Sequence, residues 1–354
     1  MKIALILGTR PEIIKMAPVI TELERKRIKY FIIHSGQHYS YNLDKIFFRQ
    51  LSLPRPDYKL DVGSTSSGEQ TGLIISRVEK ILKKDRPELV LVQGDTNTVL
   101  GGAIAAKKSG IPVGHIEAGL RSYDERMPEE LNRKLTDHCS DFLFVPTIKS
   151  RDILLREGIS KKKIFLTGNT IVDSVKWNIN EINNSKKFKT MPKKYFLVSL
   201  HRQENVDNNK RFKNIVNGLK KIKKEYMIPI IFPIHPRSKK MAKKYKIDFK
   251  GIDIIAPIDY LRFLHLEKNA FLILTDSGGV QEESCILKVP CVTLRDNTER
   301  PETIEVGSNI IAGDNPEKIL LCVNKMLKQK RNWVNPFGDG NAASKIIKII
   351  QNKI

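Results

Sequence analysis

Residues 89–118 read "LVLVQGDTNTVLGGAIAAKKSGIPVGHIEA", and this stretch decides the fold class. Two short apolar runs, at 89–95 and 112–118, flank a segment of helical character, and neither run alternates with polar residues as a half-exposed strand would. Near-continuous apolar strands separated by helices are typical of a parallel sheet that helices cover on both faces. The stretch therefore predicts a strand–helix–strand unit of an α/β domain.

The same alternation extends outward to both ends of the chain. After a lysine-rich polar segment at 183–194 a second series of strands begins, which includes "YFLVSLH", "IPIIFPIHP", "FLILTDSG" and "VPCVTL". We therefore predict an α/β fold with two Rossmann-like domains, at 1–182 and 183–335, and a final helix within 336–354 that packs back on the first domain. Ligands of such folds bind past the carboxyl ends of the strands, so the active site is expected in the interdomain cleft.

The composition is that of a globular protein. Hydrophobic residues make up 40% of the 354 positions, enough to fill two cores. No apolar run approaches the roughly 18–20 residues of a membrane span, and the opening "MKIALILGTRPE" reads as a first strand, not as a secretion signal. The four cysteines form no CxxC pair, which disfavours a metal site and a disulfide framework. We expect a cytoplasmic protein without a bound metal or a membrane partner.

The formal net charge of +23 raises the question of a nucleic-acid partner. Residues 183–250 hold twenty lysines and arginines against four acidic residues. Most of them are lysines on helix-like stretches, without interleaved aromatic residues or a recognisable nucleic-acid-binding motif. The pattern favours solvated helix faces and no specific nucleic acid, although such a field can attract a polyanionic small molecule.

Polar residues collect where the predicted strands end, which is the functional edge of an open α/β sheet. Taken alone, each has an ordinary structural explanation: Asp95, for example, can be the N-cap of the next helix. Several of them at one edge of two sheets are harder to explain that way. The residues in these positions are Thr9, Arg10, Lys15, Asp95, Glu117, His201, Arg202, Glu204, Asp276, Ser277 and Glu283.

The "SGG" at 277–279 has a specific physical use. Glycines let a ligand approach the backbone, and the N–H groups at a helix start favour an anion such as a diphosphate. The stretch is neither GxGxxG nor GxxxxGK[ST], so NAD binding and P-loop hydrolysis are not indicated. Glu283 follows one turn later, where it can accept hydrogen bonds from ribose hydroxyls. Arg10 can contact the phosphates with two parallel hydrogen bonds from its guanidinium, and Lys15 can contact them with the compact charge of its ammonium group.

The segment "HIEAGLRSYDERMPEELNR" is a second candidate site. Glu117 ends a buried strand, where an unpaired carboxylate is costly. Pro128 marks the first turn of a helix on which Glu129 and Arg133 share a face. That spacing alone also fits a surface salt bridge. The functional interpretation gains because Asp95 is expected at the same edge.

Together these residues resemble one family closely, the non-hydrolysing UDP-N-acetylglucosamine 2-epimerases, whose fold is similar to that of GT-B glycosyltransferases. The matching stretches occur in the family's order over nearly the whole chain. They are "GTRPEIIKMAP", "GQH", "VQGDTNT", "PVGHIEAGLRS", "MPEELNR", "TGNTIVD", "LTDSGGVQEE", "RDNTERPE" and "NPFGDG".

The resemblance implies reversible inversion at C2 of UDP-GlcNAc to give UDP-ManNAc, for cell-surface polysaccharide synthesis. The family's route is elimination of UDP to a 2-acetamidoglucal, followed by re-addition. It needs acid and base groups on both faces of the sugar and stabilisation of the departing pyrophosphate. The implied catalytic residues are Asp95, Glu117, Glu129, Arg133 and His201, with Arg133 orienting Glu129; which carboxylate serves which face stays open.

The resemblance also implies a nucleotide pocket, a homodimer and no organic cofactor or metal. Phe263 has an alternative interpretation as ordinary helix core. Bacterial relatives often carry a second, regulatory UDP-GlcNAc site, but here Ser40 stands where a glutamine is common, and "HRQENVDN" departs from the family's usual "HRRE". The pocket residues are Arg10, Lys15, Ile258, Phe263, Ser277, Gly278, Gly279, Glu283 and Arg300, and those of the regulatory site are Gln37, His38 and Gln70.

Three other functions compete with this one. A hydrolysing 2-epimerase, which releases ManNAc and UDP, could use the same residues, so product analysis separates the two. A retaining glycosyltransferase has little need for three carboxylates at one edge of the first domain. A nucleic-acid-binding protein would show salt-sensitive binding of DNA or RNA.

Overall fold

The computed structural model divides the chain into two compact units. The first unit ends at Lys176, inside helix α7 (Thr170–Asn184), whereas the change in composition at 183–194 suggested a later boundary. The change in composition comes later because α7 continues into the second unit before the lysine-rich segment begins. The described residues are 1–36, 47–63, 65–184 and 192–354; the first unit comprises Met1–Lys176 and Phe337–Ile354, and the second Trp177–Pro336.

Within the described residues, the first unit contains a seven-stranded sheet in the order β3-β2-β1-β4-β5-β6-β7. All of its pairings are parallel, as the apolar runs predict. The strands are β1 (Lys2–Leu7), β2 (Lys29–His34), β3 (Tyr58–Lys59), β4 (Leu89–Gln93), β5 (Val113–Ile116), β6 (Phe142–Val145) and β7 (Ile164–Leu166).

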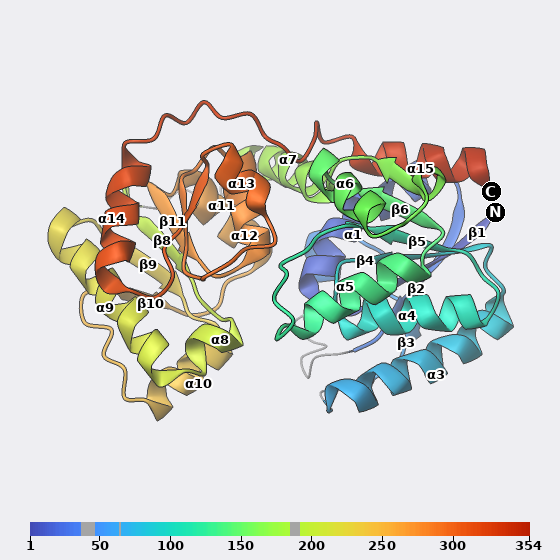
Figure 1. Ribbon diagram of the computed structural model, residues 1–354, viewed down its shortest axis with the longest axis horizontal. Helices are drawn as coiled ribbons and strands as arrows, with labels where there is room; N and C mark the ends of the chain where they lie inside the picture. The colour runs from blue at the N-terminus through green and yellow to red at the C-terminus, as the bar shows by residue number, and fades with distance from the viewer. Residues whose placement is uncertain (37–46, 64, 185–191) are drawn as a thin grey trace. The chain divides into compact units, whose positions relative to one another are not determined.

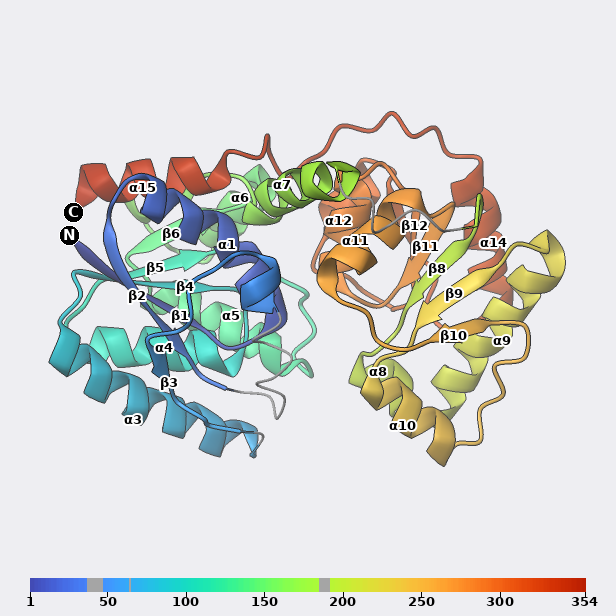
Figure 2. The ribbon, with the colours of Figure 1, turned by 180° about the vertical axis from the view of Figure 1, so that it is seen from behind.

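Helices cover both faces of this sheet. In Figures 1 and 2, α3, α4 and α5 lie on one side, and α1 and α15 lie together on the other. The C-terminal helix therefore packs on the first unit. The helices are α1 (Arg10–Arg25), α3 (Ser67–Asp85), α4 (Asn97–Lys108), α5 (Pro128–Cys139), α6 (Ile148–Arg156), the 3-10 turn η1 (Lys161–Lys163), the first part of α7, and α15 (Ala342–Lys353).

In the part of the chain that is described, the second unit repeats this plan with a six-stranded parallel sheet in the order β10-β9-β8-β11-β12-β13. Its strands are β8 (Phe196–Ser199), β9 (Ile230–Pro233), β10 (Asp253–Ile255), β11 (Leu272–Thr275), β12 (Cys291–Thr293) and β13 (Asn309–Ile311). Its helices are α8 (Gln203–Val206), α9 (Asn209–Tyr226), α10 (Pro236–Lys244), α11 (Tyr260–Asn269), α12 (Gly278–Ile286), α13 (Pro301–Glu305) and α14 (Pro316–Leu327).

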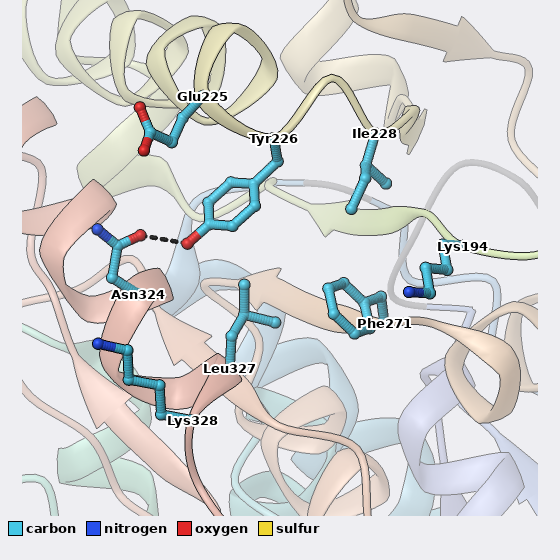
Figure 3. A pocket seen from close by; sticks show the side chains of 8 residues that line it. All are labelled: Lys194, Glu225, Tyr226, Ile228, Phe271, Asn324, Leu327 and Lys328. Atoms are coloured by element: carbon cyan, nitrogen blue, oxygen red, sulfur yellow. Dashed lines mark hydrogen bonds between the residues drawn. The ribbon is translucent and has the colours of Figure 1, made fainter.

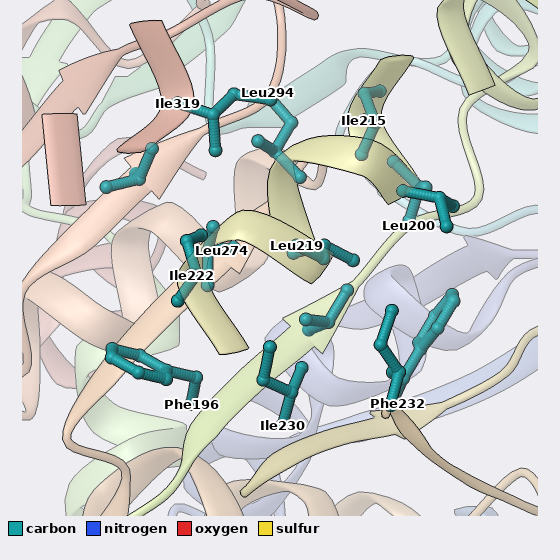
Figure 4. Close-up of a cluster of buried hydrophobic side chains, with 14 of the residues drawn as sticks. Phe196, Leu200, Ile215, Leu219, Ile222, Ile230, Phe232, Leu274, Leu294 and Ile319 are labelled. Atoms are coloured by element: carbon teal, nitrogen blue, oxygen red, sulfur yellow. The ribbon is translucent and has the colours of Figure 1, made fainter. Parts of the chain in front are cut away.

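The cores show why these strands are apolar throughout. On β8, Phe196 and Val198 join the cluster under α9 and α14, part of which Figure 4 shows, whereas Leu197 and Tyr195, the residue before the strand, join a second cluster under α11 and α12. This strand thus buries both faces, which an alternating half-polar strand could not do, whereas the edge strand β10 is exposed at all three of its residues. The prediction of an α/β fold with two parallel sheets is confirmed. Among the described residues, no helix is long and apolar enough to cross a membrane.

Candidate active site

Two of the predicted carboxylates follow neighbouring strands of the first sheet. β4 and β5 pair in parallel with Gln93 opposite Ile116, the last residue of each strand. Asp95 and Glu117 come one or two residues later, so both lie at the carboxyl edge of the sheet, where open α/β folds hold their ligands.

Glu117 is the more buried of the two, with 7% of its surface exposed. Its Oε2 forms an ion pair with Lys15 of α1 and accepts hydrogen bonds from Gln93 Nε2 at 3.1 Å and Asn169 Nδ2 at 3.4 Å. Its backbone has a φ of +71°, a left-handed conformation that costs a non-glycine residue on the order of 1–3 kcal/mol. The buried carboxylate is thus paired, and its backbone is held in a strained turn of the kind found at functional sites.

Asp95 is tied to helix α5. Its Oδ2 accepts hydrogen bonds from Arg133 Nε at 3.0 Å and Nη2 at 2.6 Å. The same guanidinium donates to Glu130 Oε2 at 2.7 Å, and Glu130 in turn accepts hydrogen bonds from Ser122 and Tyr123 in the loop after Glu117. Arg133 therefore links Asp95 to this loop.

Glu130 is the carboxylate of α5 whose role the sequence did not suggest. It is 1% exposed, and burial alone would raise its pKa, but the hydrogen bonds from Ser122 and Tyr123 and the charge of Arg133 outweigh burial and lower it. Glu129, the predicted member of the pair, is half-buried on the same helix. The adjacent acidic residues in "PEEL" were the available signal, but nothing in them indicates which one is buried.

A buried carboxylate in the first turn of helix α1, Glu12, connects the start of this helix to the start of α4. Thr9 is the N-cap, and Glu12 three residues later accepts hydrogen bonds from Gly8 N at 2.6 Å and Thr9 Oγ1 at 3.0 Å. Glu12 also accepts one from Thr96 Oγ1 at 2.6 Å, directly after Asp95. Arg10, the first residue of α1, lies over the Phe47 ring with its Cζ 5.4 Å from the centroid.

Replacing Glu12 with glutamine should remove a pH dependence of stability. Burial raises the pKa of Glu12 from 4.5 to about 7, against its hydrogen bonds from Thr96, Gly8 and Thr9. Between these values the folded protein holds a proton that the unfolded chain has released, so the free energy of unfolding of the native protein falls as the pH rises. The shift corresponds to about 3 kcal/mol. Urea unfolding should show the native protein losing stability relative to Glu12→Gln up to about pH 7 and levelling off above it; a difference independent of pH would contradict the prediction.

In the second unit, helix α12 begins at Gly278 directly after Ser277. The first N–H groups of a helix have no partner within it and form a field that favours anions. A Cβ on Gly278 would lie 3.5 Å from Glu299 Oε2 and 3.8 Å from Arg300 Cζ, so a carboxylate and a guanidinium both lie beside this helix start. Arg300 is held there by Glu282, to whose Oε1 its Nε donates. The "SGG" stretch and Arg300, both predicted for the nucleotide pocket, therefore lie side by side.

Asp276 fixes the turn that carries His201. It is fully buried and accepts hydrogen bonds from His201 N at 3.0 Å and Arg202 N at 2.9 Å, and its Oδ1 lies 3.3 Å from His201 Nδ1. Desolvation of the ring lowers the pKa of His201 below its ordinary value, and the charges of Arg202 and Arg295 lower it further. The negative charge of Asp276 raises this pKa but does not outweigh the other effects. The neutral ring offers one donor and one acceptor.

Glu283, one turn into α12, belongs to a buried acidic cluster that the sequence did not reveal. Burial, followed by the charge and hydrogen bonding of Glu283, raises the pKa of Glu267 well above its usual value, and the same causes raise the pKa of Tyr260. Tyr260 therefore keeps its proton at neutral pH, and the surroundings of Glu267 favour its protonated form. Ile258 and Phe263 are partly buried and pack against the core cluster beside them, which fits both interpretations of Phe263.

Of the three residues predicted for a regulatory site, only Gln70 can be placed, because Gln37 and His38 lie outside the described residues. Gln70 is on α3, where its Nε2 donates to Gly63 O at 2.7 Å and its Oε1 accepts from Asn97 Nδ2 at 2.8 Å. Its amide thus joins α3 to the start of α4.

A pocket of about 520 Å³ in the second unit lies away from these residues. Figure 3 shows its apolar floor, which includes Phe271 and Ile228, and the hydrogen bond from Tyr226 to Asn324. Phe271 directly precedes β11, so the pocket is at the amino end of that strand. None of the predicted site residues lines it, and we do not assign the active site to it.

The two units together define a class of protein. A parallel sheet with paired carboxylates at its carboxyl edge, and a second parallel sheet with a glycine-rich helix start beside an arginine, are the features of a two-domain α/β enzyme acting on a nucleotide-linked substrate. The chain belongs to the UDP-N-acetylglucosamine 2-epimerase family, whose model matches residues 21–351.

Close relatives support this membership. The chain is 55% identical over 361 residues to the UDP-N-acetylglucosamine 2-epimerase of Methanocaldococcus jannaschii, with 99% of each chain covered. It is 56% identical over 360 residues to that of Methanococcus maripaludis, covering 99% of this chain and 98% of the relative. A crystal structure of the M. jannaschii enzyme in complex with UDP-GlcNAc and UDP superposes with a TM-score of 0.96 at 56% identity, over 99% of this chain and all of that one. The fold is therefore the GT-B-like fold of this family.

Proposed function

We propose that this chain interconverts UDP-GlcNAc and UDP-ManNAc by inverting C2 of the sugar. The proposal rests on the two carboxylates Asp95 and Glu117, held at the ends of neighbouring strands in a chain of this family. It is supported by the similar M. jannaschii enzyme, whose crystal structure contains UDP-GlcNAc and UDP.

The reaction proceeds by elimination and re-addition. A base removes the C2 proton, the C1–O bond breaks, and its electron pair leaves with UDP, so that a C1=C2 double bond forms in a 2-acetamidoglucal. UDP then adds back to C1 while a proton is delivered to the opposite face of C2. Each proton transfer needs a side chain within hydrogen-bonding reach of C2, and the departing diphosphate needs fixed positive charge and N–H donors.

The first unit supplies the acid and base groups. The carboxylates of Asp95, Glu117 and Glu129 exchange protons with the sugar. The ion pair with Lys15 stabilises the carboxylate form of Glu117, which is the form that accepts a proton. Arg133 holds Asp95 through two hydrogen bonds and so fixes its direction.

The second unit supplies most of the nucleotide site. The start of α12 and Arg300 bind the diphosphate, Glu283 binds the ribose, and His201 donates a hydrogen bond to the departing phosphate. Ile258 and Phe263 contact the base. In the first unit, Arg10 is the candidate for a phosphate contact, because Lys15 is already paired with Glu117.

The same proposal includes the setting of the enzyme. We infer that it works in the cytoplasm as a homodimer and supplies UDP-ManNAc for cell-surface polysaccharide. A regulatory UDP-GlcNAc site would include Gln37, His38 and Gln70. Sedimentation of the purified protein, with and without UDP-GlcNAc, tests the dimer.

The deciding experiment is incubation of the purified protein with UDP-GlcNAc in D2O, followed by proton and phosphorus NMR. We expect intact UDP-ManNAc with deuterium at C2, because the proton lost in the elimination is replaced from solvent. Accumulation of free UDP and ManNAc would instead indicate the hydrolysing reaction. No change from either UDP-GlcNAc or UDP-ManNAc would refute the proposal.

A further inference from the structure

A buried polar cluster in the first unit lies directly behind the two turns that carry Asp95 and Glu117. It consists of His115 on β5, Asp137 on α5 and Arg121 in the loop between them, and each is at most 3% exposed. None of the three is among the predicted catalytic or binding residues, yet charged groups are rarely buried this deeply without a role in holding structure or function.

His115 reaches the turn that carries Asp95. Its Nε2 lies 2.8 Å from the carbonyl oxygen of Gly94, the residue before Asp95, and its Nδ1 lies 2.7 Å from Asp137 Oδ1. Gly94 has a φ of +92°, so this turn leaves the regular strand geometry at the point where His115 holds it.

Asp137 reaches the turn that carries Glu117. Its Oδ2 accepts a hydrogen bond from Gly119 N at 3.2 Å and forms an ion pair with Arg121 Nη1 at 2.7 Å. Glu117 and Gly119 both have left-handed backbones, with φ of +71° and +80°. Such a conformation persists only where the surroundings hold it, and Asp137 provides a fixed acceptor inside it.

We propose that the His115–Asp137 pair is a positioning device that fixes Asp95 and Glu117 relative to each other for proton transfer at C2. The pair joins the two turns through one continuous chain of hydrogen bonds, from Gly94 O through His115 and Asp137 to Gly119 N. The inference rests on the proposed function, because it assigns a task to residues that hold the proposed acid and base groups.

The chemistry of the pair shows how to test it. Both partners of His115 are acceptors, so the two hydrogen bonds form together only when both ring nitrogens carry a proton. Burial alone would raise the pKa of Asp137, but the hydrogen bond and charge of His115 and the charge of Arg121 outweigh it and lower the pKa, so Asp137 is ionised and accepts from all its neighbours. An amide side chain can replace only half of this arrangement: asparagine places its nitrogen near the position of Nδ1, and glutamine near that of Nε2.

The experiment compares His115→Asn, His115→Gln and His115→Ala with the native enzyme. The measurements are kcat per UDP-binding site and the isotope effect with substrate deuterated at C2. We expect kcat to fall on the order of 10- to 100-fold in the two amide variants and further in His115→Ala, as for a displacement of reacting groups by about 1 Å. The isotope effect should rise because the proton transfer becomes slower than the other steps, and the dissociation constant of UDP should stay within about twofold.

The matched control is Asp173→Asn. The Asp173 carboxylate also accepts backbone hydrogen bonds, from Ala342 N at 3.2 Å and Ala343 N at 3.0 Å, but these hold α15. The Asp173→Asn variant should be less stable than the native enzyme but should keep the native kcat per site and the native isotope effect.

Two results would overturn the inference. One is a kcat per site within about twofold of the native value in all three His115 variants. The other is a lower kcat with an unchanged isotope effect, which is the result expected if the pair only stabilises the fold. A native enzyme that does not exchange the C2 proton would overturn the proposed function and the inference with it.

Discussion

Replacing Glu117 with glutamine should abolish exchange of the C2 proton while UDP still binds. The carboxylate is 7% exposed, is paired with Lys15 and lies at the carboxyl edge of the first sheet. Glutamine has nearly the same shape but cannot take up a proton at neutral pH. A positioned acid or base contributes typically 10²- to 10⁴-fold to a rate, and we expect a loss in that range. Deuterium incorporation at C2 in D2O measures it directly.

Loss of folded protein has to be separated from loss of chemistry in this experiment. Removing the charge of Glu117 leaves Lys15 buried without its anion, which by itself can cost several kcal/mol of stability. The rate is therefore expressed per UDP-binding site, counted by calorimetric titration. Glu22→Gln is a suitable control, because Glu22 is also a buried carboxylate on the first unit, with Arg25 at 2.6 Å, but lies far along α1. Near-native exchange in Glu117→Gln would show that Glu117 has been assigned wrongly.

The sequence predicted those features of the site that depend on local rules. Apolar runs identified the parallel strands, and the strand ends placed Asp95 and Glu117 at one edge of the sheet. Pro128 marked the start of α5, which does begin at Pro128, because proline presets the φ of a first helical residue. The glycine-rich start of α12 was recognised from its position, because it directly follows an apolar strand and precedes a helical pattern.

What the sequence could not predict is which side chains meet across the fold. Lys15 was expected to contact phosphate, but in the structure its ammonium pairs with Glu117, 102 positions away. The i,i+4 spacing suggested Glu129 as the partner of Arg133, but it gave no sign of the hydrogen bonds that Arg133 donates to Glu130 and to Asp95, 38 positions away. Helical periodicity gives the face on which a residue lies, but the partner depends on how that face packs on the sheet.

The buried residues behind the site were missed for a related reason. His115 lies inside an apolar strand, where a histidine interrupts the apolar pattern without indicating a partner. Asp137 lies near the end of a helix, where an acidic residue is usually predicted to be exposed to solvent. Only the packing of α5 on the sheet shows that they contact each other. A polar residue at a core position of a strand was the one available signal, because such a residue needs a partner.

Substituting alanine for Gly279 should weaken UDP binding without harming the fold. The neighbour of a Cβ built at Gly279 within 4 Å is Ser277 Oγ at 3.9 Å, which is ordinary contact, and alanine favours a helix over glycine by roughly 1 kcal/mol. If a diphosphate lies against the start of α12, the added methyl group occupies its space. Forcing one methyl group into a close-packed contact costs about 1–3 kcal/mol, which corresponds to a roughly 10- to 100-fold higher dissociation constant.

The matched control for this steric argument is Gly72→Ala on α3, where an added Cβ meets nothing within 4 Å. Both substitutions replace a helical glycine, so both should keep or raise the thermal midpoint of unfolding. Only Gly279→Ala should weaken UDP in calorimetric titration, and uridine, which has no phosphate, should be affected much less by it. Unchanged UDP affinity in Gly279→Ala would mean that the diphosphate does not approach this helix start, and equal losses for UDP and uridine would mean that the methyl group acts on the nucleoside instead. The comparison therefore tests where the phosphates lie and not only whether the nucleotide binds.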